Sequence, residues 1–412
     1  MSKAASAPDR PRHLYTSYVI GLFALGMSDL YVIVVPLFAL SIGASATEVG
    51  ILTGARAFLP TIMAIHGGSL MDRMGTRRII LWCSGLTAVM VLMIPTFPYF
   101  WPLLILQVFS GLFMTYTWIG AQALVAHICH GDAVSLGRFN FVVRIGTICA
   151  PIFVGLLWDF GGAWPTFGMV AVWSVIMGVL TWFVPEPNAA VTEAKPPSLR
   201  EVLPTISDYT RTFALFAIPV IAFTIIIGAL RNGSTGLQVS IYVVYLESIG
   251  LQGTGIGILF AVLEGAMALA SLCVGKRGRL GSSNLVIAGT AIIAIASIAI
   301  TPFLGGVLGL LIIAAVIRGG AQGFMLPILA SVQSKTAGKD YQGAIVGLRL
   351  SINRITTVLV PPIAGAMADI WGMEAGFVAG GGILIVGVLA MTLYVARKPE
   401  FHIKDDDAPT AR

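Results

Sequence analysis

Long apolar runs alternate with short polar segments along the whole chain. A helix that spans a bilayer needs about 20 mostly apolar residues. By this measure the sequence predicts twelve spanning helices, at residues 16–40, 47–69, 78–98, 102–128, 138–160, 164–184, 216–247, 253–275, 284–303, 307–331, 346–369 and 375–395. Composition supports the prediction, because 57% of the residues are hydrophobic and only 11% are charged, against roughly a quarter in a soluble domain. We therefore predict an all-α membrane protein.

Lysines and arginines gather in every second loop. The opposite loops contain neither residue, at 41–46, 99–101, 161–163, 248–252, 304–306 and 370–374. Because short cytoplasmic loops carry the excess of Lys and Arg, we predict that both termini are cytoplasmic. Topology thereby explains the formal net charge of +6, and no nucleic-acid partner is expected. Short loops and tails favour a bacterial inner membrane.

The two halves of the sequence repeat. SIGASATEVGIL at 41–52 matches SIGLQGTGIGIL at 248–259, an offset of 207, and residues 137–162 match 347–372 at an offset of 210. Two parallel repeats of six helices characterise several transporter folds. We therefore predict two pseudo-symmetric six-helix bundles, at 1–184 and 213–396. A proline-rich cytoplasmic linker would occupy 185–212, and a cytoplasmic tail 397–412.

The segment GSLMDRMGTRR, at Gly68 to Arg78, is a basic turn between two apolar runs. Its pattern resembles the signature loop between the second and third helices of the major facilitator superfamily. The resemblance implies transport by alternating access of two bundles, with this loop as part of the cytoplasmic gate. It assigns gating roles to the matched positions Gly68, Asp72, Arg73, Gly75, Arg77 and Arg78. We also predict gating roles for Arg144 and Arg354, because they are related by the repeat and lie near the cytoplasmic ends of their spans.

The same resemblance implies partners for the gate. Asp72 would meet the start of the eleventh span, where a helix dipole favours an acid. Arg73 and Arg78 would pair with acids of their own bundle. Asp132 and Asp340 are candidate partners for this loop. For Arg144 and Arg354, anchoring to lipid headgroups and contact with the substrate are alternatives to gating.

Seven charged residues lie six or more residues inside a predicted span, at a depth where charge is costly and usually functional. They are Asp29, Arg56, Arg144, Arg231, Glu264, Arg318 and Arg354. Five arginines against two acids suit an anionic substrate, because arginine stays charged when buried and matches carboxylate or phosphate. We predict substrate contacts at Arg56, Arg231, Asn232, Arg318 and Tyr116. For Tyr116 aromatic packing is the alternative.

Asp29 and Glu264 are the two carboxylates near mid-depth, and we predict proton coupling through at least one of them. A buried carboxyl is neutral away from a cation and ionised beside one, so a site that alternates between these environments can move a proton. Asp29 and Arg56 are alternatively a structural ion pair. Around Arg231 the seventh span is rich in glycine, at Gly228, Gly233 and Gly236, and we expect the helix to be weakened or kinked there.

The fifth span carries Gly146, Pro151 and Gly155, similar to the glycine-proline signature of the family's proton-antiporting exporters. The fourth span departs from their pattern, because Gln107 stands where a buried arginine is usual. Arg318 is a candidate substitute from the other half.

We therefore predict a proton-coupled exporter, an antiporter of a small organic anion. Alternatives are uptake or exchange of an organic or phosphorylated anion, and translocation of a lipid or lysolipid. An intramembrane enzyme or a receptor finds no support in the motifs. The four cysteines have no metal-site spacing, and we expect no cofactor and no metal. The expected partners are the substrate, protons and the lipid bilayer, and the expected state is a monomer.

Overall fold

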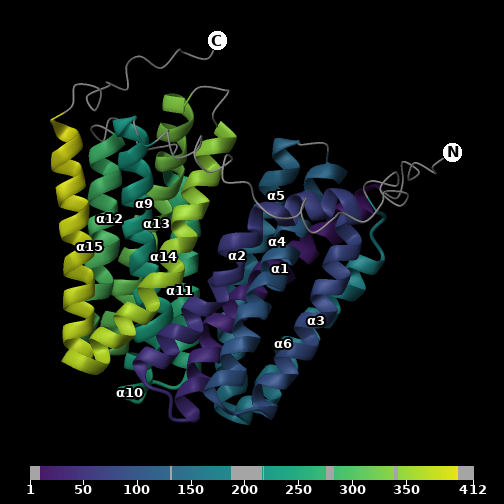
Figure 1. Cartoon of the computed structure of the whole chain (residues 1–412), viewed down its shortest axis with the longest axis horizontal. Coiled ribbons are helices and arrows are strands. Elements are labelled where there is room, and N and C mark those ends of the chain that lie inside the picture. Colours follow the sequence, from purple (N-terminus) through teal and green to yellow (C-terminus); the bar gives the residue numbers. More distant parts are fainter. Residues whose placement is uncertain are drawn as a thin grey trace. The chain divides into compact units, whose positions relative to one another are not determined.

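The computed structural model describes residues 10–129, 132–186, 216, 218–274, 283–337 and 342–397. Every regular element in these ranges is a helix. The first half contains α1 (Arg10–Ser41), α2 (Ala46–Met74), α3 (Thr76–Thr96), α4 (Phe100–Ile128), α5 (Ala133–Gly161) and α6 (Ala163–Trp182) (Figure 1). The second half contains α9 (Pro219–Leu237), η3 (Gln238–Tyr242), α10 (Val243–Ser248), α11 (Gly253–Cys273), α12 (Ser283–Ala299), η5 (Thr301–Leu304), α13 (Leu308–Ala337), α14 (Gln342–Trp371) and α15 (Met373–Ala396).

The prediction of twelve spanning helices agrees with this order. Elements α9, η3 and α10 follow one another without a gap and form one long segment, and η5 is a single short turn. Among the described residues, nine helices are long and apolar enough to cross a membrane. Helices α2, α12 and α14 complete the series as further helices of 29, 17 and 30 residues.

Contacts divide the chain into two compact units. The first unit holds residues 1–44, 51–204 and 250–261, and the second holds 45–50, 205–249 and 262–412. In the first, α1 packs against α4, α5 and α6. In the second, α9 packs against α12, α13, α14 and α15 (Figure 1). The predicted linker lies almost wholly outside the described residues, as does the tail, so both boundaries stay predictions.

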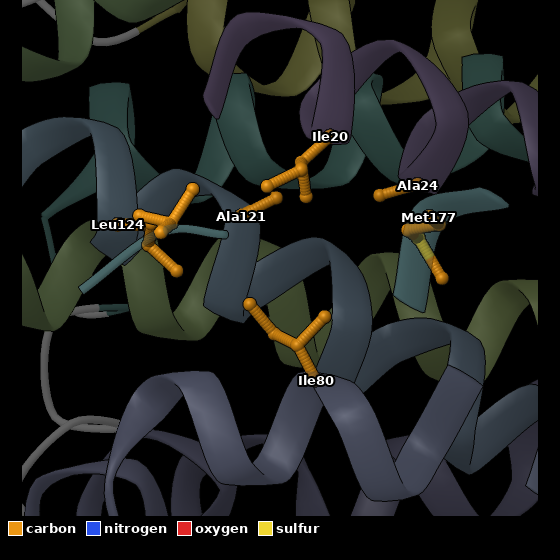
Figure 2. Packing of buried hydrophobic residues seen from close by; sticks show 7 residues of the cluster. Ile20, Ala24, Ile80, Ala121, Leu124 and Met177 are labelled. Atoms are coloured by element: carbon orange, nitrogen blue, oxygen red, sulfur yellow. The ribbon is translucent and has the colours of Figure 1, made fainter. Parts of the chain in front are cut away.

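Small side chains allow the helices of the first unit to pack closely. Ile20 and Ala24 of α1 belong to one buried cluster with Ala121 of α4 and Met177 of α6, and Figure 2 shows Ile20 beside Ala121. Apolar burial drives little association inside a bilayer, because lipid tails are as apolar as these side chains. Close van der Waals packing of such clusters is therefore what holds the helices together.

Two glycines set equivalent close approaches in the two halves. A Cβ atom at Gly111 of α4 would overlap the carbonyl oxygen of Arg56 on α2. A Cβ atom at Gly319 of α13 would overlap the carbonyl oxygen of Leu263 on α11. The two glycines are 208 residues apart in sequence, close to the predicted repeat offset. Both positions therefore require glycine for the same reason, which is the direct packing of one helix backbone on another.

Two aspartates cap helices in the same repeated way. In the first unit, Asp159 accepts hydrogen bonds from the backbone N–H groups of Gly253 and Thr254, at 2.7 Å each, and from Oγ1 of Thr254 at 2.5 Å. In the second unit, Asp369 accepts from the backbone N–H groups of Ala46 and Thr47, at 3.1 and 2.8 Å. The first N–H groups of a helix have no partner within it. Asp159 therefore fastens the start of α11 to the end of α5, and Asp369 fastens the start of α2 to the end of α14.

The basic segment is mostly helical, so its prediction as an eleven-residue turn from Gly68 to Arg78 is wrong. Helix α2 continues to Met74, α3 begins at Thr76, and Gly75 alone reverses the chain, with φ of +96°. A helix of 29 residues is about 43 Å long and outruns the roughly 30 Å of a hydrocarbon core. The apolar run therefore ends well before the helix does.

The seventh span is not kinked at Arg231, as we expected it to be. It stays α-helical from Pro219 to Leu237, and a π-helical turn follows at Gln238–Tyr242. The glycines of α9 face bulky neighbours, since a Cβ atom at Gly233 would lie 2.9 Å from Leu384 and one at Gly236 would lie 2.9 Å from Val360. Tight packing on α14 and α15 keeps this stretch regular. The irregular turn, of a kind common at functional sites, lies about two to three turns beyond Arg231.

We predict that Gly319→Ala destabilises the protein and that Gly320→Ala does not. The added methyl group at Gly319 meets the backbone of α11, whereas a Cβ atom at Gly320 has nothing within 4 Å. Overpacking of this kind costs about 1–3 kcal/mol. Thermal unfolding of both variants in detergent measures the difference. Equal melting temperatures for the two would contradict the close approach.

We predict that Asp159→Ala and Asp369→Ala each lower the unfolding free energy by about 1 kcal/mol, the usual cost of a lost helix cap. Asp159→Asn and Asp369→Asn should lose less, because an amide oxygen still accepts a hydrogen bond. The measurement is thermal unfolding of the four purified variants. A loss as large with asparagine as with alanine would show that capping is not what these side chains contribute.

Candidate functional site

Arg56 of α2 reaches α1 within the first unit. Its Nη1 donates to the carbonyl oxygen of Ser28 at 3.1 Å, next to Asp29, which is half-buried. Tyr31 is 1% exposed, and its hydroxyl lies within electrostatic reach of Arg56. The predicted proton-carrying acid and one predicted substrate contact therefore lie at adjoining positions on α1 and α2.

Helix α4 adds amide and hydroxyl groups to this part of the first unit. Gln107 is 1% exposed, and no described residue accepts a hydrogen bond from its Nε2. Ser110 is fully buried and lies next to Gly111, the point at which α4 meets the backbone of Arg56. Gln107 is neutral, so the positive charge at this meeting of α2 and α4 belongs to Arg56.

Two buried arginines dominate the interior of the second unit. Arg231 of α9 is 9% exposed and Arg318 of α13 is 3% exposed. Nη2 of Arg318 donates to the carbonyl oxygen of Ser234 at 2.9 Å, which joins α13 to α9. No described residue accepts a hydrogen bond from Nε of Arg231 or from Nε of Arg318. A buried donor of this kind is costly unless something pairs with it.

The charges around Arg318 have both signs. Its guanidinium interacts electrostatically with Tyr242 of the π-helical turn, with Arg231 and with Glu264 of α11. Gly319 brings α13 onto the backbone of α11 at Leu263, which explains why the neighbouring residues Arg318 and Glu264 interact. The predicted substrate contacts Arg231 and Arg318 and the predicted proton carrier Glu264 therefore form one group within the second unit.

A polar stripe on α14 faces this group. Arg349, Asn353 and Thr357 are spaced four residues apart and so share one side of the helix. Asn232, beside Arg231, donates through Nδ2 to the carbonyl oxygen of Asn353 at 3.0 Å and to Oγ1 of Thr357 at 3.1 Å. Asn232 therefore ties α9 to α14.

Sequence reasoning missed Arg349 and Gln333. Nη1 of Arg349 donates to Oε1 of Gln333 on α13 at 3.3 Å, and Nε2 of Gln333 donates to Oγ1 of Thr224 on α9 at 3.2 Å. Arg349 lies near the start of its predicted span, where a charge is unremarkable. Its four-residue spacing with Asn353 and Thr357 is the signal that would have found it.

Tyr116 lies in a packed hydrophobic cluster. It belongs to one buried cluster with Met71, Ile79, Cys83 and Leu112, and its hydroxyl donates to the carbonyl oxygen of Met63 at 3.2 Å. This environment favours the alternative of aromatic packing over substrate contact.

The basic segment has an acidic partner that the sequence did not suggest. The backbone N–H of Arg77 donates to Oε1 of Glu186 at 3.4 Å, and Nη2 of Arg77 donates to the carbonyl oxygen of Trp182 at 2.6 Å. The guanidinium also lies over the Trp182 ring, 5.3 Å from its centre. Gly75 is close to the same carboxylate, since a Cβ atom there would lie 2.8 Å from Glu186.

Asp132, a candidate partner of these arginines, is the N-cap residue of α5. Its carboxylate accepts from the backbone N–H of Ser135 at 2.8 Å, and hydrogen bonds from the side chain and backbone of Ser135 lower the pKa of Asp132. Asp340 lies outside the described residues, as do the side chains of Asp72 and Arg73. The gating roles of Gly68, Asp72 and Arg73 therefore stay predictions.

Arg144 and Arg354 are half-buried at equivalent places on α5 and α14. The carbonyl oxygen of Arg144 accepts from Oγ1 of Thr147 at 3.0 Å. Their gating role also stays a prediction. In the described part of the chain, no three His, Cys, Asp or Glu side chains come together as metal ligands would.

Comparison with known proteins places this arrangement in a family. The family model of the Major Facilitator Superfamily matches residues 17–232 and 222–410. The chain is 25% identical over 430 residues to the multidrug resistance protein MdtG of Enterobacter lignolyticus (strain SCF1), covering 99% of this chain and 100% of that protein. It is 23% identical to the protein of the same name from Klebsiella pneumoniae (strain 342), covering 96% of each.

Solved structures share the fold at low identity. The nucleoside transporter NupG matches with a TM-score of 0.72 and 14% identity, covering 93% of this chain and 99% of that one. A bacterial homolog of the human lysosomal transporter Spinster, in an inward-facing and unoccupied conformation, matches with a TM-score of 0.71 and 16% identity, covering 96% of this chain and 97% of the other. The chain is an integral membrane transporter and belongs to the major facilitator superfamily.

Proposed function

We propose that this chain is a secondary active transporter of a small organic anion and works as a proton-coupled exporter by alternating access. The observation that carries the proposal is the pair Arg231 and Arg318, two buried guanidinium groups whose Nε donors have no acceptor among the described residues. Arginine stays charged when buried, and its fork matches carboxylate and phosphate groups. An anionic group bound between these side chains would supply the missing acceptors.

Export is proposed from the relatives, since the matched proteins are named as multidrug resistance proteins. Glu264 and Asp29 are the proposed proton carriers, because each lies near an arginine. A buried carboxyl group is ionised while it faces the positive charge and takes up a proton when that charge is engaged elsewhere. Both termini would then be cytoplasmic, in a bacterial inner membrane. Arg144, Arg354 and the basic segment would serve the gate.

Proton and anion moving in the same direction is a second candidate, and the interaction of Glu264 with Arg318 favours it. While Glu264 is ionised it attracts Arg318 and competes with an anionic substrate. Once protonated, it leaves Arg318 available, so that proton and anion bind together. Such coupling fits uptake of an organic or phosphorylated anion, and the direction of proton movement separates the two candidates.

We predict that proteoliposomes containing the protein transport at least one of benzoate, glucose 6-phosphate and lysophosphatidylglycerol in preference to the lipophilic cation tetraphenylphosphonium. Arg231→Gln and Arg318→Gln should each raise KM for the transported anion at least tenfold, because a hydrogen bond to a charged group contributes about 1.5–3 kcal/mol. Arg12→Gln, at an exposed position on α1, is the matched control. Transport of the cation, with both variants active, would overturn the anionic substrate.

We predict that Glu264→Gln abolishes substrate-dependent proton movement while anion binding is retained. The assay is anion flux recorded with a pH-sensitive dye inside the vesicles, with Asp29→Asn run beside it. Proton movement opposite to the anion supports export by antiport, and movement with the anion supports the second candidate. Unchanged proton coupling in both variants would exclude these two acids as the carriers.

A further inference from the structure

We infer that Arg349 is the first of three arginines that form an anion-binding row in the second unit. Arg349 lies nearest the starts of α9 and α14, and the row leads an anion from it to Arg231 and Arg318. The inference rests on the proposed function and assigns a role to a residue outside the predicted set. It is carried by three helices, α9, α13 and α14, which pack against one another within the second unit.

The three arginines lie at successive depths. A helix rises about 1.5 Å per residue, so Arg349, seven residues into α14, is about 10 Å from the start of that helix. Arg231, twelve residues into α9, is about 18 Å from the start of α9. Arg318 bonds to the carbonyl oxygen of Ser234, three residues further along α9. Gln333 bonds both to Arg349 and to Thr224, which is five residues into α9. Arg349 therefore lies at about the level of Thr224, before Arg231 along α9.

The row is connected electrostatically. The positive charge of Arg349 repels that of Arg231, and the positive charge of Arg231 repels that of Arg318. Three mutually repelling cations are unfavourable unless anions neutralise them. Glu264 provides one negative charge at the Arg318 end. The Arg349 end is held by a neutral amide, so its positive charge remains available to an anionic ligand.

Gln333 fixes Arg349 in position. Both ends of its amide are engaged, since Oε1 accepts from Arg349 at 3.3 Å and Nε2 donates to Thr224 at 3.2 Å. Gln333 is 4% exposed and Thr224 is fully buried, so the amide is held between two packed helices. Gln333 is thus a positioning residue, and a glutamate at this position would form an ion pair with Arg349 and cancel the charge.

A purely structural role for Arg349, joining α13 to α14, is the competing explanation. The two explanations differ for Gln333→Glu. If the role of Arg349 is structural, the new ion pair strengthens the contact between α13 and α14, and transport stays intact. If Arg349 binds the anion, the ion pair cancels the charge that the anion needs, and transport is impaired.

The test uses charged thiol reagents and requires no knowledge of the substrate. Single cysteines are introduced as Asn353→Cys and Thr357→Cys, on the stripe of α14 that continues from Arg349, after the four native cysteines have been replaced. The rates of reaction with sulfonatoethyl and trimethylammonioethyl methanethiosulfonate are compared in membranes. We expect the anionic reagent to react faster, and Arg349→Gln and Gln333→Glu each to lower the ratio of the two rates about tenfold. Arg349→Lys and Arg12→Gln should preserve the ratio.

An unchanged ratio in Arg349→Gln would overturn the inference, and so would an absence of reaction at both cysteines, because an anion path needs an aqueous route. For the anion identified by the transport assay, Arg349→Gln should raise KM at least fivefold with little change in maximal rate. If no anion is transported at all, the proposed function fails, and the reagent ratio still decides whether Arg349 attracts anions.

Discussion

An arginine side chain stays charged wherever the fold places it, and the second unit buries two of them in an apolar helical interior. Much of the local structure can be understood as a response to this constraint. The carbonyl oxygen of Ser234 accepts one hydrogen bond from Arg318, and Glu264 and Tyr242 interact with its charge. These partners leave donors on Arg231 and Arg318 unsatisfied among the described residues. These unpaired donors are the reason why we propose an anion-binding site here and not a structural ion pair.

The two halves share a framework and differ in chemistry. Gly111 and Gly319 each admit the backbone of a neighbouring helix, and Asp159 and Asp369 each cap the start of another. At an offset of 208, Ser110 occupies the place of Arg318. Arg56 and Glu264 lie at nearly equivalent positions with opposite charge. Packing therefore constrains the repeat, while the polar positions beside the packing glycines have diverged.

The helical segments, the repeat and the principal buried charges could be predicted from sequence, because apolar run length and charge at depth are local properties. The pairing of Arg349 with Gln333 could not be predicted, since it depends on the rotation of α13 relative to α14. The end of α2 was misplaced because backbone hydrogen bonds extend a helix beyond its apolar run. The expected kink at Arg231 did not form, because Leu384 and Val360 support the glycines of α9. Glu186 escaped notice because it is close to Arg77 in space but 109 residues away in sequence.

The most direct test of the account is to locate a bound anion. Crystals grown with 4-bromobenzoate, or with a brominated form of whichever anion is transported, would give an anomalous signal at the bromine atom. The account predicts that the ligand's acidic group lies within hydrogen-bonding distance of both Arg231 and Arg318, with its oxygens accepting from the two Nε donors. A ligand bound elsewhere, with the Glu264 carboxylate hydrogen-bonded to both arginines, would contradict it.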